Sequence, residues 1–598
     1  MKNFFTSMLG TLAALWVFFV GGALVLAIIF VAIGAMGRKS SIAVTPGSYL
    51  VFDLAVNITD APADSGGFSG DRNDVLQLRA VTRALRAAAT DDRIAGVFIT
   101  GSLEPSGYGA GFAALKEVRE AIGACRAAGK PVVAYLDFAR TRDLYLASAA
   151  SDVVLDPYGE IFLPGLASEP MFFTGALEKF GIGVQVTRVG KYKSFVEPFT
   201  RKDMSPENRA QTQKLLDDMW TQIVRDITAA RGIDPAALQK AVDERGLFAA
   251  EPARAAKLVD RLAYRDEILA ELKLKTGRTG AKEAFKQITL ADYAEMLPDG
   301  ASKSRSGKKD RKIAVVYAEG DIVDGEGDAG EVGGDKFSRL LRKLRQDDSV
   351  KAIVLRVNSP GGSATAAEEI QRELRLARKV KPVVVSMGTV AASGGYWISA
   401  YGDRIYAEPA TITGSIGVFG MFFNVQKLAG DLGLTFDVAK TGKFADSFTI
   451  TRPKTDEELA LSQQLVDWIY DQFITKVSEG RHLDRAVVEE IAQGRVWSGT
   501  EARKLGLVDE IGGLDAALKF AAQKADLRGN YRVDEYPESK DWTDVIADWL
   551  KGEKPGQAEG ADVFSRLLAQ IKEQVKTLGE FNDPRGVYAR LPLEVMVK

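Results

Sequence analysis

Residues 380–384 read Val-Lys-Pro-Val-Val, and residues 129–133 read Gly-Lys-Pro-Val-Val, at an offset of 251 positions. The correspondence continues further along the chain, where Leu-Val-Asp at 258–260 recurs at 507–509. The matching unit spans roughly 250 residues, far more than the 20–50 residues of a solenoid repeat. The sequence therefore predicts a duplicated domain, with two similar copies in tandem.

Both copies alternate apolar, strand-like stretches with helical segments. The first copy opens with a strand-like stretch at 49–54. In the second copy we expect strands at 313–317, 352–357 and 382–386, and helices at 364–379 and 393–401. A strand, helix, strand, helix order favours right-handed crossovers on a parallel sheet. The predicted fold class is α/β, with two tandem domains built on largely parallel sheets.

The N-terminal region contains an uncharged apolar run of 29 residues, from Met8 to Met36. As a helix rising about 1.5 Å per residue, this run more than covers a ~30 Å hydrocarbon core. We therefore expect residues 1–45 to be a transmembrane anchor. A cleavable signal peptide is the alternative, since residues 32–35 are small, but such signals have an apolar core of only ~7–15 residues.

The remaining boundaries follow from the repeat and from local composition. Residues 46–300 form the first predicted domain and residues 313–535 the second. A polar linker at 301–312 joins them, without the periodicity of a helix or a strand. Residues 536–598 form a C-terminal tail that has no counterpart in the first copy, so its role is left open.

The composition excludes several kinds of site. A net charge of -2 argues against nucleic acid as the main partner. Cys125 is the single cysteine, so neither an internal disulfide nor a cysteine metal cluster is possible. The single histidine, His482, lies in a predicted turn between helices. A Ser-His-Asp triad is therefore excluded unless His482 supplies it.

Two glycine-rich segments are candidates for chemistry. Residues 387–397 (Met-Gly-Thr-Val-Ala-Ala-Ser-Gly-Gly-Tyr-Trp) place Ser393 between a strand and a helix, as a nucleophile or simply as a helix N-cap. Residues 358–363 (Asn-Ser-Pro-Gly-Gly-Ser) are either an ordinary turn or a source of backbone N–H groups for an oxyanion. Loss of one such donor typically costs roughly 3–4 kcal/mol in the transition state.

The two copies differ at the positions where hydrolysis needs reactive groups. Ser393 faces Arg142 at the 251-residue offset, and after one insertion Lys193 faces Ala445. Serine survives in one copy and lysine in the other, which predicts one composite site. As a base, Lys193 needs its pKa lowered from ~10.4 toward ~7–8 by a dry environment. Otherwise it is an ordinary surface lysine.

At these motifs the chain resembles the signal peptide peptidase A family in its long, duplicated form, also called protease IV. These are serine peptidases of the crotonase and Clp protease superfamily. The resemblance covers nearly the whole chain. It rests on the segments at 192–194 and 196–199, 358–362, 391–397 and 413–417 (Thr-Gly-Ser-Ile-Gly).

The resemblance implies a role for each matching residue and a fold for each copy. Ser393 is the implied nucleophile, Lys193 the general base, and Ser415 the group that hydrogen-bonds the lysine amine. The implied oxyanion donors are the amides around Gly361, Gly362 and Gly394. Each copy is expected to be a crotonase/Clp-protease-like domain, the first supplying the lysine and the second the serine.

The family also implies what the residues alone do not show. Its substrates are remnant signal peptides, cleaved on the periplasmic side of the bacterial inner membrane by a single-pass homotetramer. No metal and no organic cofactor are expected. Two rival readings stay open: a crotonase-like acyl-CoA enzyme, and a non-catalytic scaffold that binds membrane peptides.

Overall fold

The computed structural model describes residues 43–62, 75–103, 108–280, 282–297, 311–527, 531–537 and 582–591, together with residues 16 and 19–21. The chain divides into residues 1–45 and a compact unit of residues 46–598. The predicted anchor at 8–36 lies almost wholly outside the described residues. Within the described part, no helix has the length and apolar character needed to cross a bilayer.

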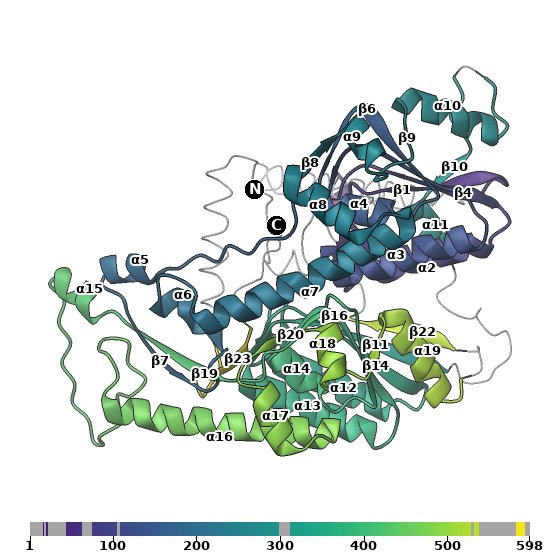
Figure 1. Cartoon of the computed structure of the whole chain (residues 1–598). Helices are drawn as coiled ribbons and strands as arrows, with labels where there is room; N and C mark the ends of the chain where they lie inside the picture. Colours follow the sequence, from purple (N-terminus) through teal and green to yellow (C-terminus); the bar gives the residue numbers. More distant parts are fainter. Residues whose placement is uncertain are drawn as a thin grey trace, which may run out of the picture. The chain divides into compact units, whose positions relative to one another are not determined.

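The first copy forms a seven-stranded, mostly parallel sheet (Figure 1). Its strands are β1 (Ser48–Asp53), β4 (Ile94–Thr100), β5 (Val132–Arg140), β6 (Asp152–Phe162), β8 (Leu247–Ala249), β9 (Arg261–Leu262) and β10 (Gln287–Thr289). They follow the order β10-β1-β4-β5-β6-β8, with β9 also beside β6. Of these, β8 alone runs antiparallel to its neighbour.

The second copy forms an eight-stranded sheet of matching order, β22-β11-β14-β16-β18-β20, with β17 and β21 alongside. Its strands are β11 (Lys312–Glu319), β14 (Val350–Ser359), β16 (Val383–Ala392), β17 (Arg404–Ala407), β18 (Ile412–Gly414), β20 (Val496–Ser498), β21 (Glu510–Ile511) and β22 (Arg532–Tyr536). The predicted duplication is confirmed, because corresponding strands lie in the same spatial order in the two sheets.

Helices cover both faces of the second sheet, which explains its continuous apolar strands. On β14, Ile353 and Leu355 pack toward α12 (Gly334–Gln346), α13 (Ala364–Arg378) and α14 (Gly394–Ser399). The alternate residues Ala352 and Val354 pack toward α19 (Leu514–Lys524). A strand buried on both faces is expected to be apolar on both, as β14 is from Ala352 to Leu355.

The predicted elements of the second copy are confirmed, with one extension. The strand expected at 382–386 continues as β16 to Ala392, so α14 begins only at Gly394. β16 is longer because it pairs first with β17 and then with β18. This extension carries the chain to Ser393 at the edge of the sheet.

A six-stranded sheet combines both copies and the tail, in the order β13-β12-β15-β23-β19-β7. Its strands are β7 (Gly183–Arg188), β12 (Ile322–Val323), β13 (Val332–Gly333), β15 (Gly361–Ser363), β19 (Phe419–Asn424) and β23 (Val587–Arg590). From the first copy, β7 runs antiparallel to β19 of the second. From the tail, β23 lies between β15 and β19.

The remaining helices and the short β2–β3 pair connect these sheets. They are β2 (Asn57–Thr59), β3 (Val75–Gln77), α2 (Leu78–Thr90), α3 (Phe112–Ala127), α4 (Thr141–Ala147), α5 (Thr174–Lys179), α6 (Glu197–Thr200), α7 (Pro206–Arg231), α8 (Pro235–Arg245), α9 (Ala250–Ala255), α10 (Arg265–Lys275), α11 (Leu290–Met296), α15 (Gln426–Asp431), α16 (Asp456–Arg481), α17 (Arg485–Ile491) and α18 (Gly499–Lys504). His482 is the exposed C-cap between α16 and α17, which confirms the predicted turn.

Candidate active site

Ser393 lies in a strained turn between β16 and α14. Its backbone has φ 56° and ψ −114°, a conformation that costs a non-glycine residue about 1–3 kcal/mol. The turn is held by two backbone hydrogen bonds: Ser393 N–H donates to the Gly414 carbonyl at 2.8 Å, and Trp397 N–H donates to the Ser393 carbonyl at 2.8 Å. The Ser393 side chain does not cap α14. Capping therefore does not explain this serine.

Lys193 is brought to the second copy by the loop that follows β7. Within this loop, Tyr192 N–H donates to the Gln493 carbonyl at 3.0 Å. Gly494 packs so closely that a Cβ there would lie 2.7 Å from the Lys193 backbone nitrogen, and its φ is +74°. Only glycine fits both conditions without strain. Backbone contacts between the copies thus fix the lysine.

The Lys193 amine lies among polar atoms of the second copy. Its Nζ is 2.7 Å from Ser393 Oγ, 3.1 Å from Ser415 Oγ and 3.2 Å from the Ser415 carbonyl oxygen. Ser415 follows β18 with φ 49°, and its N–H donates to the Arg495 carbonyl at 2.6 Å. The lysine and both serines are fully buried. The three side chains predicted from the sequence therefore lie in one cluster.

Burial changes the chemistry of the lysine. Lys193 is 0% exposed. The residues that follow it in the sequence belong to a hydrophobic cluster that also includes residues of the second copy and of the tail. Its buried members are Phe195, Val196, Phe199, Phe419, Met421 and Tyr588. Removal from water penalises the ammonium form and lowers the pKa of Lys193 well below its ordinary value. A lysine amine with a lowered pKa accepts a proton more readily at a given pH than an exposed lysine does.

The two glycine-rich segments meet beside Ser393. A Cβ on Gly361 would lie 2.6 Å from the Gly394 backbone nitrogen, and one on Gly394 would lie 3.2 Å from the Gly362 nitrogen. Gly361 and Gly362 have φ of +103° and +152°. Gly361 N–H donates to Ser359 Oγ at 3.2 Å. Bare backbone from both segments thus surrounds one small space next to the serine.

The C-terminal strand β23 enters that space. Its residue Ala589 pairs with Gly362 in an antiparallel ladder. The Ala589 carbonyl oxygen lies 2.0 Å from the point that a Cβ on Gly361 would occupy, and 3.1 Å from the corresponding point on Gly394. An extended peptide thus already lies along the glycine-rich segment, with a carbonyl against it.

The residues that correspond to Ser393 and Lys193 in the other copy of the domain do not form a second site. Arg142, opposite Ser393 in the repeat, is half-buried with its guanidinium over the Phe112 ring. Ala445, opposite Lys193, is exposed, and the neighbouring Lys443 pairs with Glu457. The docking of β23 and the packing of Gly494 were missed from the sequence, because no repeat or motif marks either one.

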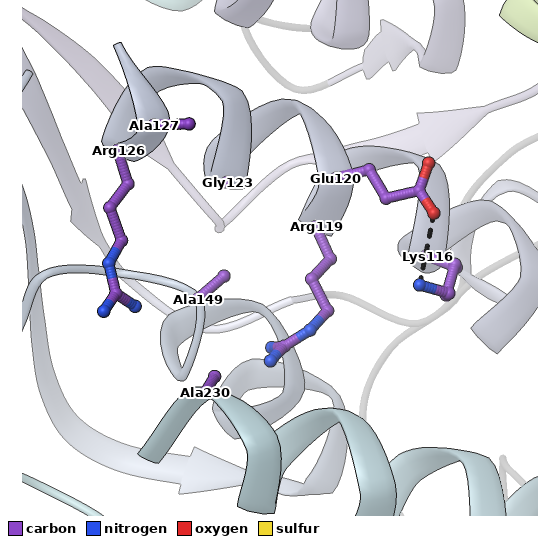
Figure 2. Close-up of a pocket in the computed structure, with 8 residues that line it drawn as sticks. All are labelled: Lys116, Arg119, Glu120, Gly123, Arg126, Ala127, Ala149 and Ala230. Atoms are coloured by element: carbon purple, nitrogen blue, oxygen red, sulfur yellow. Dashed lines mark ion pairs between the residues drawn. The ribbon is translucent and has the colours of Figure 1, made fainter. Parts of the chain in front are cut away.

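A separate pocket of about 470 Å³ lies in the first copy (Figure 2). Its charged lining includes Arg119, which is held by the Tyr145 carbonyl and Ser148 Oγ, and the Lys116–Glu120 ion pair. The full lining is Lys116, Arg119, Glu120, Gly123, Arg126, Ala127, Ala149 and Ala230. None of the residues around Ser393 belongs to it.

Comparison with known proteins identifies the family. The sequence profile of peptidase family S49 matches residues 124–278 and again 375–528, and that of Clp protease matches residues 315–412. The chain belongs to peptidase family S49. Its two matches fall one in each copy, and the chain is accordingly a serine peptidase that acts on peptides.

Similar proteins match over most of the chain. Protease 4 of Salmonella typhi is 34% identical over 93% of this chain and 91% of its own length. Protease 4 of Haemophilus influenzae is 36% identical over 95% and 94%. The chloroplastic serine protease SPPA of Arabidopsis thaliana is 32% identical over 82% and 71%.

The lowered pKa of Lys193 predicts a pH-dependent stability. Between the folded pKa and the unfolded value of ~10.4, the unfolded chain binds the additional proton, so wild-type stability rises with pH. The Lys193→Met variant has no amine at this position, so its unfolding is not accompanied by this proton binding. We expect the variant to unfold at a higher temperature than the wild type at pH 7, with a difference that shrinks as pH approaches 10.

Thermal unfolding followed by circular dichroism between pH 6 and pH 10 measures this difference. Lys443→Met is the matched control, since the Lys443 side chain is 61% exposed, and it should follow the wild type throughout. A Lys193→Met difference that stays constant with pH would show that Lys193 is charged in the folded protein.

Proposed function

We propose that this S49 peptidase is a membrane-anchored endopeptidase that hydrolyses apolar peptides, among them remnant signal peptides. Ser393 is its nucleophile and Lys193 its general base. The observation that carries the proposal is the 2.7 Å separation of Lys193 Nζ from Ser393 Oγ, with both side chains fully buried. The exchange of serine and lysine between the copies supports the same pair independently.

Acylation begins with the neutral Lys193 amine. It accepts the Ser393 hydroxyl proton as Oγ attacks the peptide carbonyl carbon, and the carbonyl oxygen becomes an oxyanion. The resulting ammonium then donates its proton to the leaving amine as the C–N bond breaks, which leaves an acyl-enzyme. Ser415 accepts a hydrogen bond from the amine and keeps it directed at Ser393.

The oxyanion lies against the glycine-rich segments. Gly362 and Gly394 are the proposed backbone donors, because both nitrogens border the space beside Ser393. Gly361 N–H already donates to Ser359 Oγ, so Gly361 contributes mainly the room left by its missing side chain. In deacylation, Lys193 accepts a proton from water as the water attacks the ester, and then returns a proton to Ser393 Oγ.

The proposed anchor is the apolar run at 8–36, and the proposed location of residues 46–598 is the periplasmic side of a bacterial inner membrane. A homotetramer is proposed as the assembly. Exposed apolar side chains between residues 432 and 450 support an apolar partner for this region, with Leu434 57% and Phe448 81% exposed. No metal or organic cofactor enters the proposed chemistry.

Alanine substitutions test the catalytic pair. Ser393→Ala and Lys193→Ala should each lower the hydrolysis of a short apolar peptide by at least about 10³-fold, because the nucleophile and its base act as a unit. Circular dichroism checks that both variants fold. Release of new amino groups from the peptide measures the rate.

Lys443→Ala is the matched control, and it should keep the wild-type rate. Near-normal hydrolysis by Lys193→Ala would contradict the proposed base. A wild-type protein that binds the peptide without cleaving it would indicate a scaffold, and cleavage of acyl-CoA thioesters alone would indicate a crotonase-like enzyme.

The substrate peptide is proposed to bind as a strand between β15 and β19, through the main-chain pairing of β-augmentation. Because β23 lies in this slot and belongs to the same chain, it competes with substrate as an intramolecular ligand. A chain that ends at Gly586 keeps Asp583, which accepts hydrogen bonds from Ser363 and Thr365 at the start of α13. This truncation should lower the KM for a short apolar peptide by about tenfold.

Steady-state kinetics measures the effect, and a synthetic peptide of residues 582–591 provides the control. Added to the truncated enzyme, it should inhibit competitively. An unchanged KM, or a folded but inactive truncated chain, would instead make β23 a permanent structural strand.

A further inference from the structure

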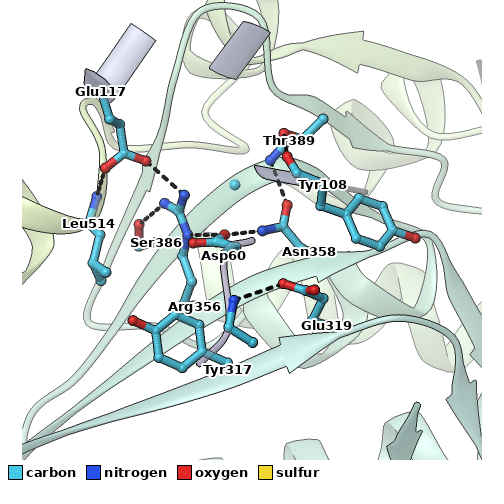
Figure 3. Close-up of polar contacts among 12 residues, drawn as sticks. Asp60, Tyr108, Glu117, Tyr317, Glu319, Arg356, Asn358, Ser386, Thr389 and Leu514 are labelled. Carbon is cyan, nitrogen blue, oxygen red and sulfur yellow. Dashed lines mark hydrogen bonds and ion pairs between the residues drawn. The ribbon is translucent and has the colours of Figure 1, made fainter. Parts of the chain in front are cut away.

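A buried polar cluster joins the first copy to β14 of the second, behind the glycine-rich segment (Figure 3). The first copy contributes Asp60 and Glu117, and β14 contributes Arg356 and Asn358. Asp60, Arg356 and Asn358 are each 1% exposed, and Glu117 is 5% exposed. Charges buried this deeply are costly unless they are paired, so their partners matter.

Arg356 is held on three sides by side chains. Its Nε donates to Asp60 Oδ2 at 2.6 Å, its Nη2 to Glu117 Oε1 at 2.7 Å, and its Nη1 to Ser386 Oγ at 2.8 Å. Glu117 also accepts the N–H of Leu514 at 2.8 Å. Both carboxylates come from the first copy, and together they bind one arginine of the second.

Asn358 links this cluster to the strand that carries the nucleophile. Its Nδ2 donates to Asp60 Oδ2, and its Oδ1 accepts the N–H groups of Thr389 at 2.6 Å and Val390 at 3.3 Å. Figure 3 shows the side chain between Asp60 and Thr389. Asn358 immediately precedes Ser359, and the glycine-rich β15 begins two residues later.

These bonds fall where the pairing of β14 with β16 changes register. Val357 pairs with Met387, but Ser359 pairs with Ala391, so β16 has two extra residues at this point. The backbone N–H groups of Thr389 and Val390 in this bulge donate to Asn358 Oδ1 instead of to a strand. The first copy also contacts the bulge, because Thr389 Oγ1 donates to the Tyr108 carbonyl at 2.6 Å.

The cluster is not part of the duplicated scaffold. Ile313 pairs with Ala352 in the second sheet as Tyr49 pairs with Gly96 in the first, and this register matches Arg356 to Thr100 and Asn358 to Ser102. Neither first-copy residue can form these ionic and amide contacts. The β4 strand of the first copy thus has no counterpart of the arginine and asparagine that β14 contributes to the cluster.

We propose that Asp60 is a positioning residue for the peptidase reaction, which it serves by holding Asn358 and through it the bulge between the oxyanion segment and Ser393. The inference rests on the proposed roles of Ser393 and the glycine amides. The first copy then contributes two functional groups to the site, a base and the support for the oxyanion donors.

The expected consequence is a loss of transition-state stabilisation with little change in substrate binding. Without Asp60, the Asn358 amide loses its buried acceptor and is free to rotate away from the bulge. The donors at Gly362 and Gly394 then shift relative to Ser393 Oγ. Misplacement by about 1 Å at such a site costs about 100-fold in rate.

Asp60→Ala and Asn358→Ala test this role through two different ends of the same hydrogen bond. Each should lower kcat at least about tenfold and leave KM within about twofold. A peptide boronate, whose tetrahedral adduct on Ser393 places an oxygen at the donors, should bind each variant more weakly by the same factor as the loss of kcat. Asp60→Asn retains one acceptor and should recover part of the activity.

Glu117→Gln is the matched control, because it removes the charge of the other buried carboxylate that contacts Arg356 and leaves Asn358 unchanged. It should keep kcat and boronate affinity within about twofold of the wild type, whatever its unfolding temperature. All rates are compared at a temperature well below the unfolding midpoint of each variant. If Asp60→Ala does not fold, Asn358→Ala still tests the proposal, because it keeps both carboxylates that pair with Arg356.

Equal losses in Glu117→Gln and the other variants, or an unchanged kcat in Asn358→Ala, would overturn the proposal and leave the cluster with a purely structural role. Different results would be expected if the proposed role of Ser393 as the nucleophile were wrong. Ser393→Ala would then retain activity, and the boronate would not inhibit the wild type.

Discussion

The burial of one lysine amine against one serine hydroxyl is the constraint on which the rest of this structure depends. An exposed lysine is protonated at neutral pH and cannot accept a proton, so the base must be kept dry. Lys193 meets this condition at the junction of the copies, in a loop that packs backbone to backbone against Gly494. The antiparallel pairing of β7 with β19 delivers that loop to the second copy. The proposed base and the proposed nucleophile therefore lie on different copies of the duplicated domain.

Two serines of this site are held in strained backbone conformations. Ser393 and Ser415 both have positive φ, and a serine gains nothing in stability from such a conformation. Their strain is sustained by the extended β16, by its pairing with β18 and by the buried cluster around Arg356. Each support is largely buried. Buried support suits the proposed site, whose backbone donors must be aligned before substrate arrives.

Much of this could be predicted from the sequence, for a physical reason. The apolar runs of β14 and β16 are local signals, and an internal repeat separates shared scaffold from positions that differ, such as Lys193 opposite Ala445. The remaining features depend on long-range contacts between unrelated segments. Asp60 and Arg356 are 296 residues apart, and four residues of the tail supply β23. Neither has a periodic pattern, so only the folded chain brings them together.

The pH dependence of Ser393 acylation tests the composite site most directly. A serine-directed fluorophosphonate reports the acylation rate of Ser393 at each pH, independently of any peptide substrate. If Lys193 is the base, the rate rises as the amine loses its proton, with a midpoint well below 10.5, and Lys193→Ala removes both this rise and most of the rate. A Lys193→Ala variant that keeps the wild-type rate and pH dependence would contradict the composite site.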